Sequence, residues 1–295
     1  MKAIVTVGIS ASGKTTWAES FVKTNGGVII CRDDVRTEIL ESRLGRKLEA
    51  GELWKLWKFK DENLVNDVVS AKLASAAGSG DDVIIADTNL SAQRNTTLKN
   101  SLEDIGYDVE FKYFDISVED AWKRDRARFN TVGHEVIYRQ YMQYCELTKK
   151  KVIADPSKRR AIIVDIDGTL AHMVDRGPFD WHRVDEDDAY HEIVDMVNGF
   201  HDRGYSVVVT SGRDAVCRQK TLDWLRQKAV QFDVLFMRDE NDMRKDSIVK
   251  EEIFWNKIYP YFDVKLVIDD RPQVVRTWLS LGLKVAIVGN PYMEF

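Results

Sequence analysis

Gly8-Ile9-Ser10-Ala11-Ser12-Gly13-Lys14-Thr15 is the stretch that decides the fold expected for the first half of this 295-residue chain. It follows the apolar run Ala3–Val7, which has the character of a buried strand, and it leads into the helix-length segment Thr15–Thr24. A glycine-rich loop between a strand and a helix is the context in which a phosphate-binding P-loop occurs. The sequence therefore predicts an α/β nucleotide-binding domain at the start of the chain.

The residues of this loop have distinct expected roles in binding the phosphates of ATP. We expect the backbone N–H groups of Ser10–Lys14 to surround the phosphates and the Lys14 ammonium to neutralise their charge. The Thr15 hydroxyl would ligate Mg²⁺ at the positive end of the following helix. The positions predicted to bind ATP in this stretch are Gly8, Ser10, Ser12, Gly13, Lys14, Thr15 and Thr16. The alternative is a glycine-rich turn with a surface lysine, which the preceding strand disfavours.

Short runs rich in β-branched residues alternate with helix-length amphipathic segments through the first half. The runs expected to be strands are Ala3–Val7, Gly27–Cys31, Val83–Asp87 and Val109–Phe114. The segments expected to be helices are Thr15–Thr24, Glu52–Ala76 and Gln93–Ile105. Such alternation is typical of a parallel sheet with helices on its faces, so the predicted fold class is α/β.

The second half repeats this pattern around a different motif, Asp165-Ile166-Asp167-Gly168-Thr169. Its expected strands are Ala161–Asp165, Ser206–Thr210, Val234–Phe236, Leu266–Asp269 and Lys284–Val288. Its expected helices lie near Ala189–Arg203, Ala215–Lys228, Asp246–Tyr259 and Pro272–Leu281. A charge run with Pro156 precedes the first of these strands and indicates a boundary. We therefore expect α/β domains at 1–150 and 161–295, joined at 151–160 by a solvated linker whose basic residues could instead guide a polyanionic strand.

The composition fits a globular protein and excludes several other classes. The chain is 44% apolar with a formal net charge of −5, so neither disorder nor general polyanion binding is expected. Its three cysteines, Cys31, Cys145 and Cys217, lack CxxC spacing, which disfavours disulfides and zinc and favours a reducing compartment. The first apolar run is too short for a signal peptide, and no stretch approaches membrane-spanning length. We therefore expect a cytoplasmic protein without a membrane partner.

A charged motif after the second expected strand predicts where a phosphate acceptor binds. Arg32-Asp33-Asp34-Val35-Arg36 lies at the carboxyl edge of the sheet, where open α/β sheets bind ligands. Asp33 could take the proton of an attacking hydroxyl while Arg36 holds a phosphate of the acceptor. Helix N-capping by Asp33 or Asp34 is an equally open alternative. Asp87 ends the next strand, and we expect it either to contact the acceptor or to cap the strand end.

Two arginines farther along the chain are candidates for the donor side. Arg124 and Arg128 are four residues apart, so they would share one face of a helix over Lys123–Arg128. Such a face could close over the transferring phosphoryl group and place both guanidiniums on the phosphates of ATP. The alternative is an ordinary exposed charged face.

The acidic motif of the second half predicts a site that removes a phosphate, whereas the P-loop predicts a site that adds one. A buried strand delivers Asp165, Asp167 and Thr169 to its carboxyl end, around a tight turn at Gly168. Two carboxylates at this spacing suit Mg²⁺-assisted covalent catalysis, in which one attacks phosphorus and the other shuttles a proton. A structural Ca²⁺ loop is disfavoured, because the oxygen ligands come from three strand ends rather than from one loop.

The DxDGT string resembles that of the haloacid-dehalogenase phosphatase superfamily, whose remaining motifs follow in order at Thr210-Ser211-Gly212-Arg213, Lys250 and Asp269-Asp270. The resemblance implies a Rossmann-like phosphatase domain in which Asp165 becomes an aspartyl-phosphate and Asp167 acts first as acid and then as base. It implies Mg²⁺ held by Asp165, the Asp167 carbonyl and either Asp269 or Asp270. Lys250 would balance negative charge, held by Asp246, and the substrate phosphate would meet Arg176, Ser211 and Arg213.

From end to end, the chain resembles the polynucleotide 5′-kinase/3′-phosphatases of T-even bacteriophages. The resemblance rests on GxxxxGKT followed by Trp17-Ala18, and on residues 32–36, 87–90, 165–171, 176–178, 211–213, 244–246, 249–255, 262–266 and 268–271. It implies transfer of the ATP γ-phosphate to 5′-hydroxyl ends of DNA or RNA, with Asp33 as general base, Arg36 and Asp87 at the acceptor and Arg128 on the donor phosphates. It also implies removal of 3′-phosphates and opening of 2′,3′-cyclic phosphates.

The same resemblance implies a biological setting, and the chain departs from the family's pattern at one place in the loop. Enzymes of this kind heal nucleic acid ends for RNA repair in a phage-infected cell. The resemblance also implies a homotetramer as the assembly and an RNA ligase as the functional partner. The chain differs from the family's loop at Ala11-Ser12, where Gly-Ser is expected. The Ala11 Cβ limits backbone freedom there and could alter nucleotide affinity.

Two other functions remain open on the sequence alone. The P-loop and DxDGT motifs do not name the acceptor, so a metabolic fusion of a small-molecule kinase with a small-molecule phosphatase would carry the same motifs. A nucleotide-sensing module without catalysis is disfavoured, because the chain carries the full set of catalytic candidates, Lys14, Thr15, Asp33, Asp165 and Asp167.

Overall fold

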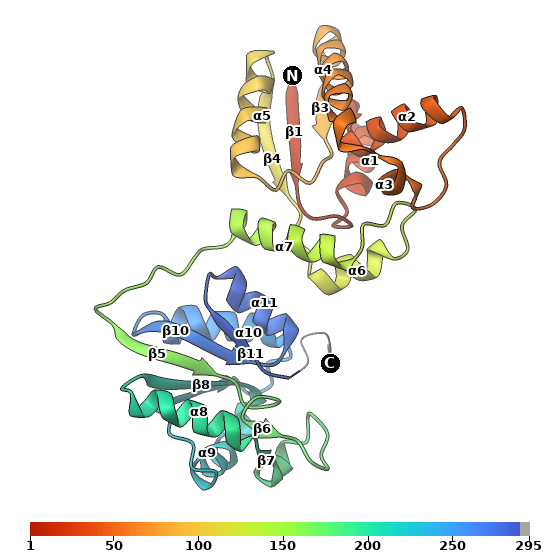
Figure 1. The fold of residues 1–295 in the computed structure, drawn as a ribbon. Coiled ribbons are helices and arrows are strands. Elements are labelled where there is room, and N and C mark those ends of the chain that lie inside the picture. Colours follow the sequence, from red (N-terminus) through yellow and green to blue (C-terminus); the bar gives the residue numbers. More distant parts are fainter. Residues whose placement is uncertain (290–295) are drawn as a thin grey trace. The chain divides into compact units, whose positions relative to one another are not determined.

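The computed structural model describes residues 1–289, and the chain divides into two compact units between Lys149 and Lys150. Each unit has one parallel sheet with flanking helices (Figure 1) and its own hydrophobic core. The segment predicted as a linker, 151–160, falls within the second unit, and its last two residues already belong to strand β5 (Arg159–Val164).

The first unit is built on a four-stranded parallel sheet in the order β2-β3-β1-β4. Its strands are β1 (Lys2–Val7), β2 (Val28–Ile30), β3 (Val83–Ile85) and β4 (Asp108–Tyr113). Its helices are α1 (Lys14–Asn25), α2 (Arg32–Leu44), α3 (Glu52–Leu56), α4 (Glu62–Ser79), α5 (Ala92–Asp104), α6 (Val118–Asp125) and α7 (His134–Thr148). The four strands lie where the β-branched runs predicted them.

Helices cover both faces of this sheet because successive residues of β1 point to opposite sides. Ala3 and Val5 pack in one core with residues of α4 and α5, whereas Ile4 packs toward α1. Because the four strands are parallel, their carboxyl ends lie at one edge of the sheet, and the loops that follow β1, β2 and β3 meet there.

One helix predicted for the first unit is wrong. The segment Glu52–Ala76 is not continuous, because α3 ends at Leu56, Trp57 takes an extended conformation, and a 3₁₀ turn at Phe59–Asp61 precedes α4. The indole N–H of Trp57 donates to Glu62 Oε1 at 2.8 Å, which fixes the break against the start of α4. The hydrophobic pattern did not reveal the break, since apolar residues continue through it at a spacing compatible with a helix.

The second unit is built on a five-stranded parallel sheet in the order β11-β10-β5-β8-β9. Its other long strands are β8 (Ser206–Asp214), β9 (Val234–Arg238), β10 (Phe262–Asp269) and β11 (Val285–Ile287), and β6 (Ala171–His172) pairs with β7 (Asp188–Ala189) in a small antiparallel sheet. Its helices are α8 (His191–Asp202), α9 (Arg218–Gln227), α10 (Asp246–Ile253) and α11 (Pro272–Ser280), with 3₁₀ turns at Trp181–Glu186 and Ala215–Cys217.

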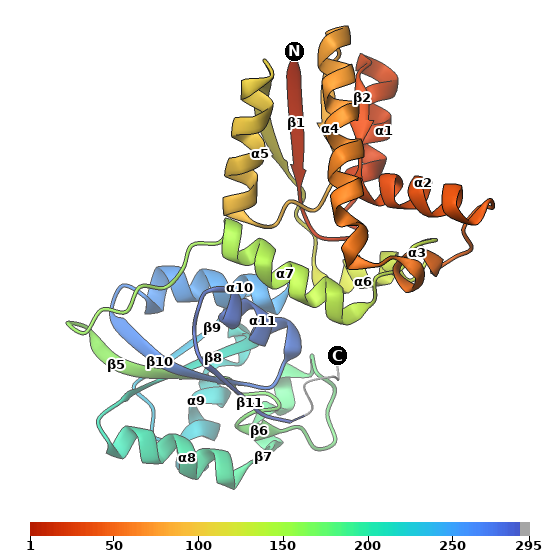
Figure 2. The ribbon, with the colours of Figure 1, turned by 45° about the horizontal axis from the view of Figure 1, so that its top comes forward.

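Helices α8 and α9 cover one face of the second sheet and α10 and α11 cover the other (Figure 2). Ile162 and Val164 of β5 pack in one core with α8 and α9, and Ala161 and Ile163 pack in the other core with α10 and α11. Two predicted helices are shorter than expected, because 215–217 form a 3₁₀ turn and 254–258 a π-helical turn. In residues 1–289, no helix combines the length and the apolar character needed to cross a membrane.

Separate cores predict separate responses to mutation. Leu102 of α5 and Leu225 of α9 are completely buried in different cores, and replacing a buried leucine with alanine costs ~2–5 kcal/mol of unfolding free energy. We expect Leu102→Ala to speed amide hydrogen exchange within the first unit and Leu225→Ala within the second. Mass spectrometry of exchanged peptides measures this, and faster exchange in both units from either variant would contradict the separation of the cores.

Candidate active sites

The P-loop of the first unit joins β1 to α1, and its open backbone donors lie at the start of α1, because Ser10 N–H donates to Gln140 and Ser12 N–H to the Ile9 carbonyl. Gly13 precedes the helix with φ 97°, and no side chain caps the helix there. The first-turn residues Thr15 and Thr16 are exposed. The N–H groups of this turn therefore remain available to an anion, at the end of the helix that attracts negative charge.

Lys14 is folded back onto the loop. Its Nζ donates to the Ile9 carbonyl at 2.6 Å and to Ser12 Oγ at 3.4 Å, and the residue is buried. Burial, together with the nearby Arg128 cation, lowers the pKa of Lys14 to about 8. A bound polyphosphate would supply the negative charge that this ammonium lacks, so the site favours an anionic ligand.

Two features fix the shape of the loop. The backbone N–H of Ser10 donates to Gln140 Oε1 of α7 at 2.7 Å. Ala11 has φ 62°, and this left-handed conformation costs roughly 1–2 kcal/mol for a residue with a Cβ. The alanine that stands where the resemblance led us to expect glycine thus strains the loop, through its Cβ.

The interpretation of Arg124 and Arg128 as one helical face is wrong, although both lie near the loop. Helix α6 ends at Asp125, and Arg128 lies in the turn beyond it. Arg124 Nη1 is 4.0 Å from the position that a Cβ would take on Gly13, and Arg128 is close enough to Lys14 to affect its pKa. The two guanidiniums reach the donor side from a helix and from a turn.

The turn that carries Arg128 is anchored by Asp125, a residue that our sequence reasoning did not select. The Asp125 carboxylate is buried and accepts backbone N–H bonds from Val132 at 3.1 Å and Gly133 at 3.0 Å. It also lies 3.3 Å from Arg128 Nη1. No spacing marks Asp125 in the sequence, because its main partners are backbone groups of the following loop.

The acceptor-side candidates gather where β2 and β3 end. Neither Asp33 nor Asp34 caps α2, because the helix begins at Arg32 with both aspartates in its first turn and no side-chain cap. Asp33 Oδ1 pairs instead with Arg36 Nη1 at 2.5 Å, and its side chain remains 45% exposed. Asp87 Oδ1 accepts the backbone N–H of Arg32 at 2.9 Å, and burial raises the pKa of Asp87 to about 6.

Glu62, the first residue of α4, is an acceptor-side residue that our sequence reasoning missed. Its Oε1 accepts from Arg36 Nε at 2.9 Å, and its Oε2 accepts from Arg36 Nη2 and Arg32 Nη2, each at 3.0 Å. The hydrogen bonds from Arg36 hold the pKa of Glu62 at about 2. Its partners come from another helix and from the break at Trp57, so no local pattern identifies it.

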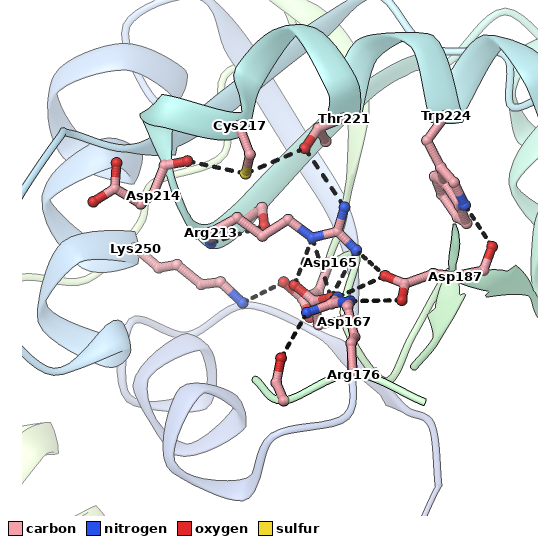
Figure 3. Close-up of polar contacts among 12 residues, drawn as sticks. Asp165, Asp167, Arg176, Asp187, Arg213, Asp214, Cys217, Thr221, Trp224 and Lys250 are labelled. Carbon is pink, nitrogen blue, oxygen red and sulfur yellow. Dashed lines mark hydrogen bonds and ion pairs between the residues drawn. The ribbon is translucent and has the colours of Figure 1, made fainter. Parts of the chain in front are cut away.

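In the second unit, Asp165 directly follows β5 and pairs with Lys250 of α10 (Figure 3). Lys250 Nζ lies 2.6 Å from Asp165 Oδ1, 3.2 Å from Asp269 Oδ2 and 3.4 Å from Asp246 Oδ2. Burial alone would lower the pKa of Lys250, but these carboxylates raise it above its ordinary value. The buried ammonium therefore stays charged and balances part of the negative charge around it.

Asp165, Asp269 and Asp270 form a cluster that could hold a cation. One carboxylate oxygen from each lies within 4.8 Å of the others. Burial raises the pKa of Asp165 well above its ordinary value and that of Asp270 to about 6, and the Asp269 charge adds to both shifts. Like charges held together in this way favour a bound cation, and an all-oxygen donor set suits Mg²⁺.

Asp167 is paired with two buried arginines. Arg213 donates to Asp167 Oδ1 from Nη2 at 2.7 Å and to Oδ2 from Nε at 2.9 Å, and Arg176 Nη2 donates to Oδ1 at 2.9 Å. Burial opposes ionisation, but the two guanidiniums lower the pKa of Asp167 below its ordinary value. In this geometry Asp167 is therefore a carboxylate.

Asp187, just before β7, completes this group and was not identified from the sequence. It accepts from Arg176 Nε at 2.7 Å and from Arg213 Nη2 at 2.7 Å (Figure 3). The side chains of Arg176 and Arg213 are 2% and 0% exposed. The geometry thus engages both predicted substrate-binding arginines with Asp167 and Asp187 rather than leaving them open at the surface.

Two more predicted positions lie at the carboxyl end of this sheet. Ser211 is completely buried, and its Oγ accepts the backbone N–H of Arg213 at 3.1 Å. The neighbouring Thr210 Oγ1 is buried without a hydrogen-bond partner among the described residues.

Gly168 has φ 85°, and a Cβ there would collide with the Asp270 carboxylate, so the turn of the DxDGT motif requires glycine.

The carboxylate cluster predicts that a divalent cation stabilises the second unit. A ligand that binds only the folded state adds about 1.4 kcal/mol for each tenfold excess over its dissociation constant. We expect millimolar MgCl₂ to raise the melting temperature of the second unit at constant ionic strength, and Asp270→Asn to remove most of this increase. Asp188→Asn, at an exposed position outside the cluster, is the matched control. An equal response in Asp270→Asn would show that the cation binds elsewhere.

Two family profiles match this chain, and a longer relative is similar to it. Residues 4–147 match the AAA domain, and residues 159–291 match the polynucleotide kinase PNKP phosphatase domain. The "Putative bifunctional polynucleotide kinase/RNA ligase" of Autographa californica nuclear polyhedrosis virus is 31% identical over 307 residues, which cover 99% of this chain. The chain spans 43% of the length of that relative.

Solved structures include a similar chain of the same extent. A chain in the structure of the Pnkp1/Rnl/Hen1 RNA repair complex is 27% identical with a TM-score of 0.47, covering 99% of this chain and 97% of that one. The family profiles and the two parallel sheets confirm the predicted fold class. The chain therefore joins two α/β domains, a P-loop domain that matches the AAA domain profile and a second domain that matches the polynucleotide kinase PNKP phosphatase profile.

Proposed function

We propose that this chain is a bifunctional enzyme that heals the ends of broken nucleic acid strands. It transfers the γ-phosphate of ATP to a 5′-hydroxyl, and it removes a 3′-phosphate or opens a 2′,3′-cyclic phosphate. The observation that carries the proposal is a P-loop with acceptor-side residues in one unit and a carboxylate-rich site in a PNKP-type phosphatase domain in the other. The name of the baculovirus relative, which includes polynucleotide kinase, supports the same class of acceptor.

On the donor side, the open N–H groups at the start of α1 bind the phosphates of ATP. Lys14 leaves the Ile9 carbonyl for these phosphates, Thr15 would hold Mg²⁺, and Arg124 and Arg128 add positive charge. The negative charge of the phosphates would raise the pKa of Lys14 from its lowered value, so binding keeps the ammonium charged.

On the acceptor side, Arg36 binds a phosphate of the acceptor nucleotide while Glu62 holds its guanidinium in place. Asp87 lies at the same edge through its bond to the backbone of Arg32. The 5′-hydroxyl oxygen attacks the γ-phosphorus, its proton passes to Asp33, and ADP leaves. The partial exposure of the Asp33 carboxylate supports this role.

In the phosphatase unit, an Asp165 oxygen attacks the phosphorus and the bond from phosphorus to O3′ breaks, with Asp167 protonating the departing oxygen. Asp167 then takes a proton from the water that attacks the aspartyl-phosphate and releases phosphate. Because Arg176 and Arg213 keep Asp167 ionised in the described geometry, one of these ion pairs must loosen when substrate enters for Asp167 to act as an acid.

Asp270 is the better candidate for the third metal ligand that the sequence left open. Both oxygens of Asp269 are engaged, Oδ1 by the backbone N–H of Arg271 at 3.2 Å and Oδ2 by Lys250 and the Trp278 indole. Asp270 accepts one side-chain hydrogen bond within the described residues, from Thr169 at 3.1 Å. When bound, Mg²⁺ supplies positive charge for the phosphoryl oxygens.

An RNA ligase is the functional partner that we propose. A ligatable strand break has a 5′-phosphate and a 3′-hydroxyl, which are the products of the two proposed activities. The baculovirus relative carries the words RNA ligase in its name, and the present chain covers only part of its length. The homotetramer implied by the phage resemblance stays a prediction, to be tested by light scattering.

One oligonucleotide tests both activities together. A short strand with a 5′-hydroxyl and a 3′-phosphate is incubated with enzyme and Mg²⁺, with and without ATP, and weighed by mass spectrometry. We expect loss of one phosphoryl group without ATP and, with ATP, a new one at the other end. An unchanged strand in both tubes, with ATP consumed only when small metabolites are added, would favour the metabolic fusion instead.

Single substitutions are expected to separate the two activities. Lys14→Ala removes the cation of the P-loop, so 5′ phosphorylation should fall at least on the order of 10²-fold while removal of the 3′-phosphate is unchanged. Asp165→Asn removes the nucleophile and should have the opposite effect. Lys99→Ala and Asp188→Asn, both at partly exposed surface positions, are controls that should keep both activities. Loss of both activities in a folded Lys14→Ala protein would contradict two independent sites.

A further inference from the structure

A basic and aromatic segment lies beside the acceptor site of the first unit. Its sequence is Trp54-Lys55-Leu56-Trp57-Lys58-Phe59-Lys60, and it runs from α3 through the break at Trp57 into the 3₁₀ turn before α4. Phe59 is 92% exposed and Trp54 is 42% exposed. Hydrophobic side chains that are grouped at the surface in this way indicate an interaction site.

The segment contacts the residue proposed to bind the acceptor phosphate. The guanidinium carbon of Arg36 lies 5.5 Å from the ring centroid of Trp54 and 6.0 Å from that of Trp57. Trp57 also donates to Glu62, the carboxylate that holds Arg36. A strand whose first internal phosphate, on the 3′ side of the 5′-hydroxyl nucleotide, meets Arg36 is therefore within reach of the Trp54 ring.

The lysines of the segment are not held in ion pairs by the acidic residues beside them. The acidic residues on either side are already engaged, Glu52 by Arg46 at 2.8 Å and Asp61 by Arg43 at 3.0 Å. Within residues 1–289, the three lysine ammonium groups of the segment form no ion pair. Unpaired lysines next to exposed aromatic rings complement a single nucleic acid strand, because its phosphates are anionic and its bases stack on rings.

We propose that Trp54–Lys60 binds the acceptor strand beyond its 5′-terminal nucleotide, with Phe59 and Trp54 stacking on bases and the lysines contacting backbone phosphates. The inference rests on the proposed kinase function and deepens it, because it makes a single strand of several nucleotides a better acceptor than one nucleotide. Stacking tolerates every base, so the segment adds affinity without base preference.

Acceptor length is the variable that tests this proposal. Steady-state phosphorylation is compared for a nucleoside 3′-monophosphate and a single 5′-hydroxyl strand of about ten nucleotides, a length within the usual site size of strand-binding proteins. For Phe59→Ala we expect KM for the strand to rise on the order of tenfold, with kcat and all constants for the monophosphate unchanged. Tyr261→Ala, which removes an exposed ring of the second unit, is the matched control and should leave both acceptors unaffected.

Salt dependence gives a second readout, specific for the lysines. In the triple variant Lys55→Ala, Lys58→Ala, Lys60→Ala, the slope of log KM for the strand against log salt concentration should fall by up to about 2, since each single-strand phosphate contact contributes about 0.7. Lys99→Ala, which removes a lysine of α5, is the control and should leave the slope unchanged.

The outcomes separate this proposal from the function on which it rests. An unchanged KM for the strand in Phe59→Ala, or an equal rise for the monophosphate, would overturn the strand-binding role. A change in oligomeric state with unchanged kinetics would assign the segment to a protein contact and would also overturn it. Failure of the unmodified enzyme to phosphorylate either acceptor would instead reject the kinase function itself.

Discussion

The buried ion pair between Lys250 and Asp165 is the interaction on which the second site depends. The ammonium is shared by three carboxylates at 2.6 to 3.4 Å, and removing one partner of a buried pair costs about 3–5 kcal/mol because the other charge is left uncompensated. Lys250 thereby allows several carboxylates to be held at the ends of β5 and β10. Because Asp270 adds further negative charge to the same cluster, the folded unit is prepared for a cation rather than complete without one.

In the first unit, the candidate site includes buried or partly buried cations, and groups of the protein compensate them as Lys250 compensates the carboxylates. Its candidate cations have internal partners, Lys14 on the Ile9 carbonyl and Arg36 on Glu62. Glu62 orients Arg36 before any phosphate arrives, so less of the binding free energy is lost to ordering that side chain. The quartet of Arg176, Arg213, Asp167 and Asp187 does the same in the second unit. In both units, other residues of the protein compensate the charged side chains of the candidate site and hold them in position.

Features that depend on neighbouring residues in the sequence could be predicted, and features that depend on contacts between distant elements could not. The strands could be predicted because parallel strands buried on both faces leave continuous apolar runs such as Ile162–Val164. Asp165 could be placed because it directly follows such a run, and Lys14 because it closes the glycine-rich loop after another. Glu62 and Asp187 could not, since their partners belong to other elements. The shared helical face of Arg124 and Arg128 failed because α6 stops at Asp125.

The break at Trp57 connects the fold of the first unit to its chemistry. A continuous helix would have had a single apolar face through this region, but the break directs the Trp57 indole onto Glu62 and leaves Phe59 almost fully exposed. Keeping a ring of this size in water forgoes ~1.5–3 kcal/mol that its burial would contribute. Folding of the unit gains nothing from that exposure. The proposed acceptor strand would cover the ring, and the neighbouring lysines suit the anionic phosphates of that strand.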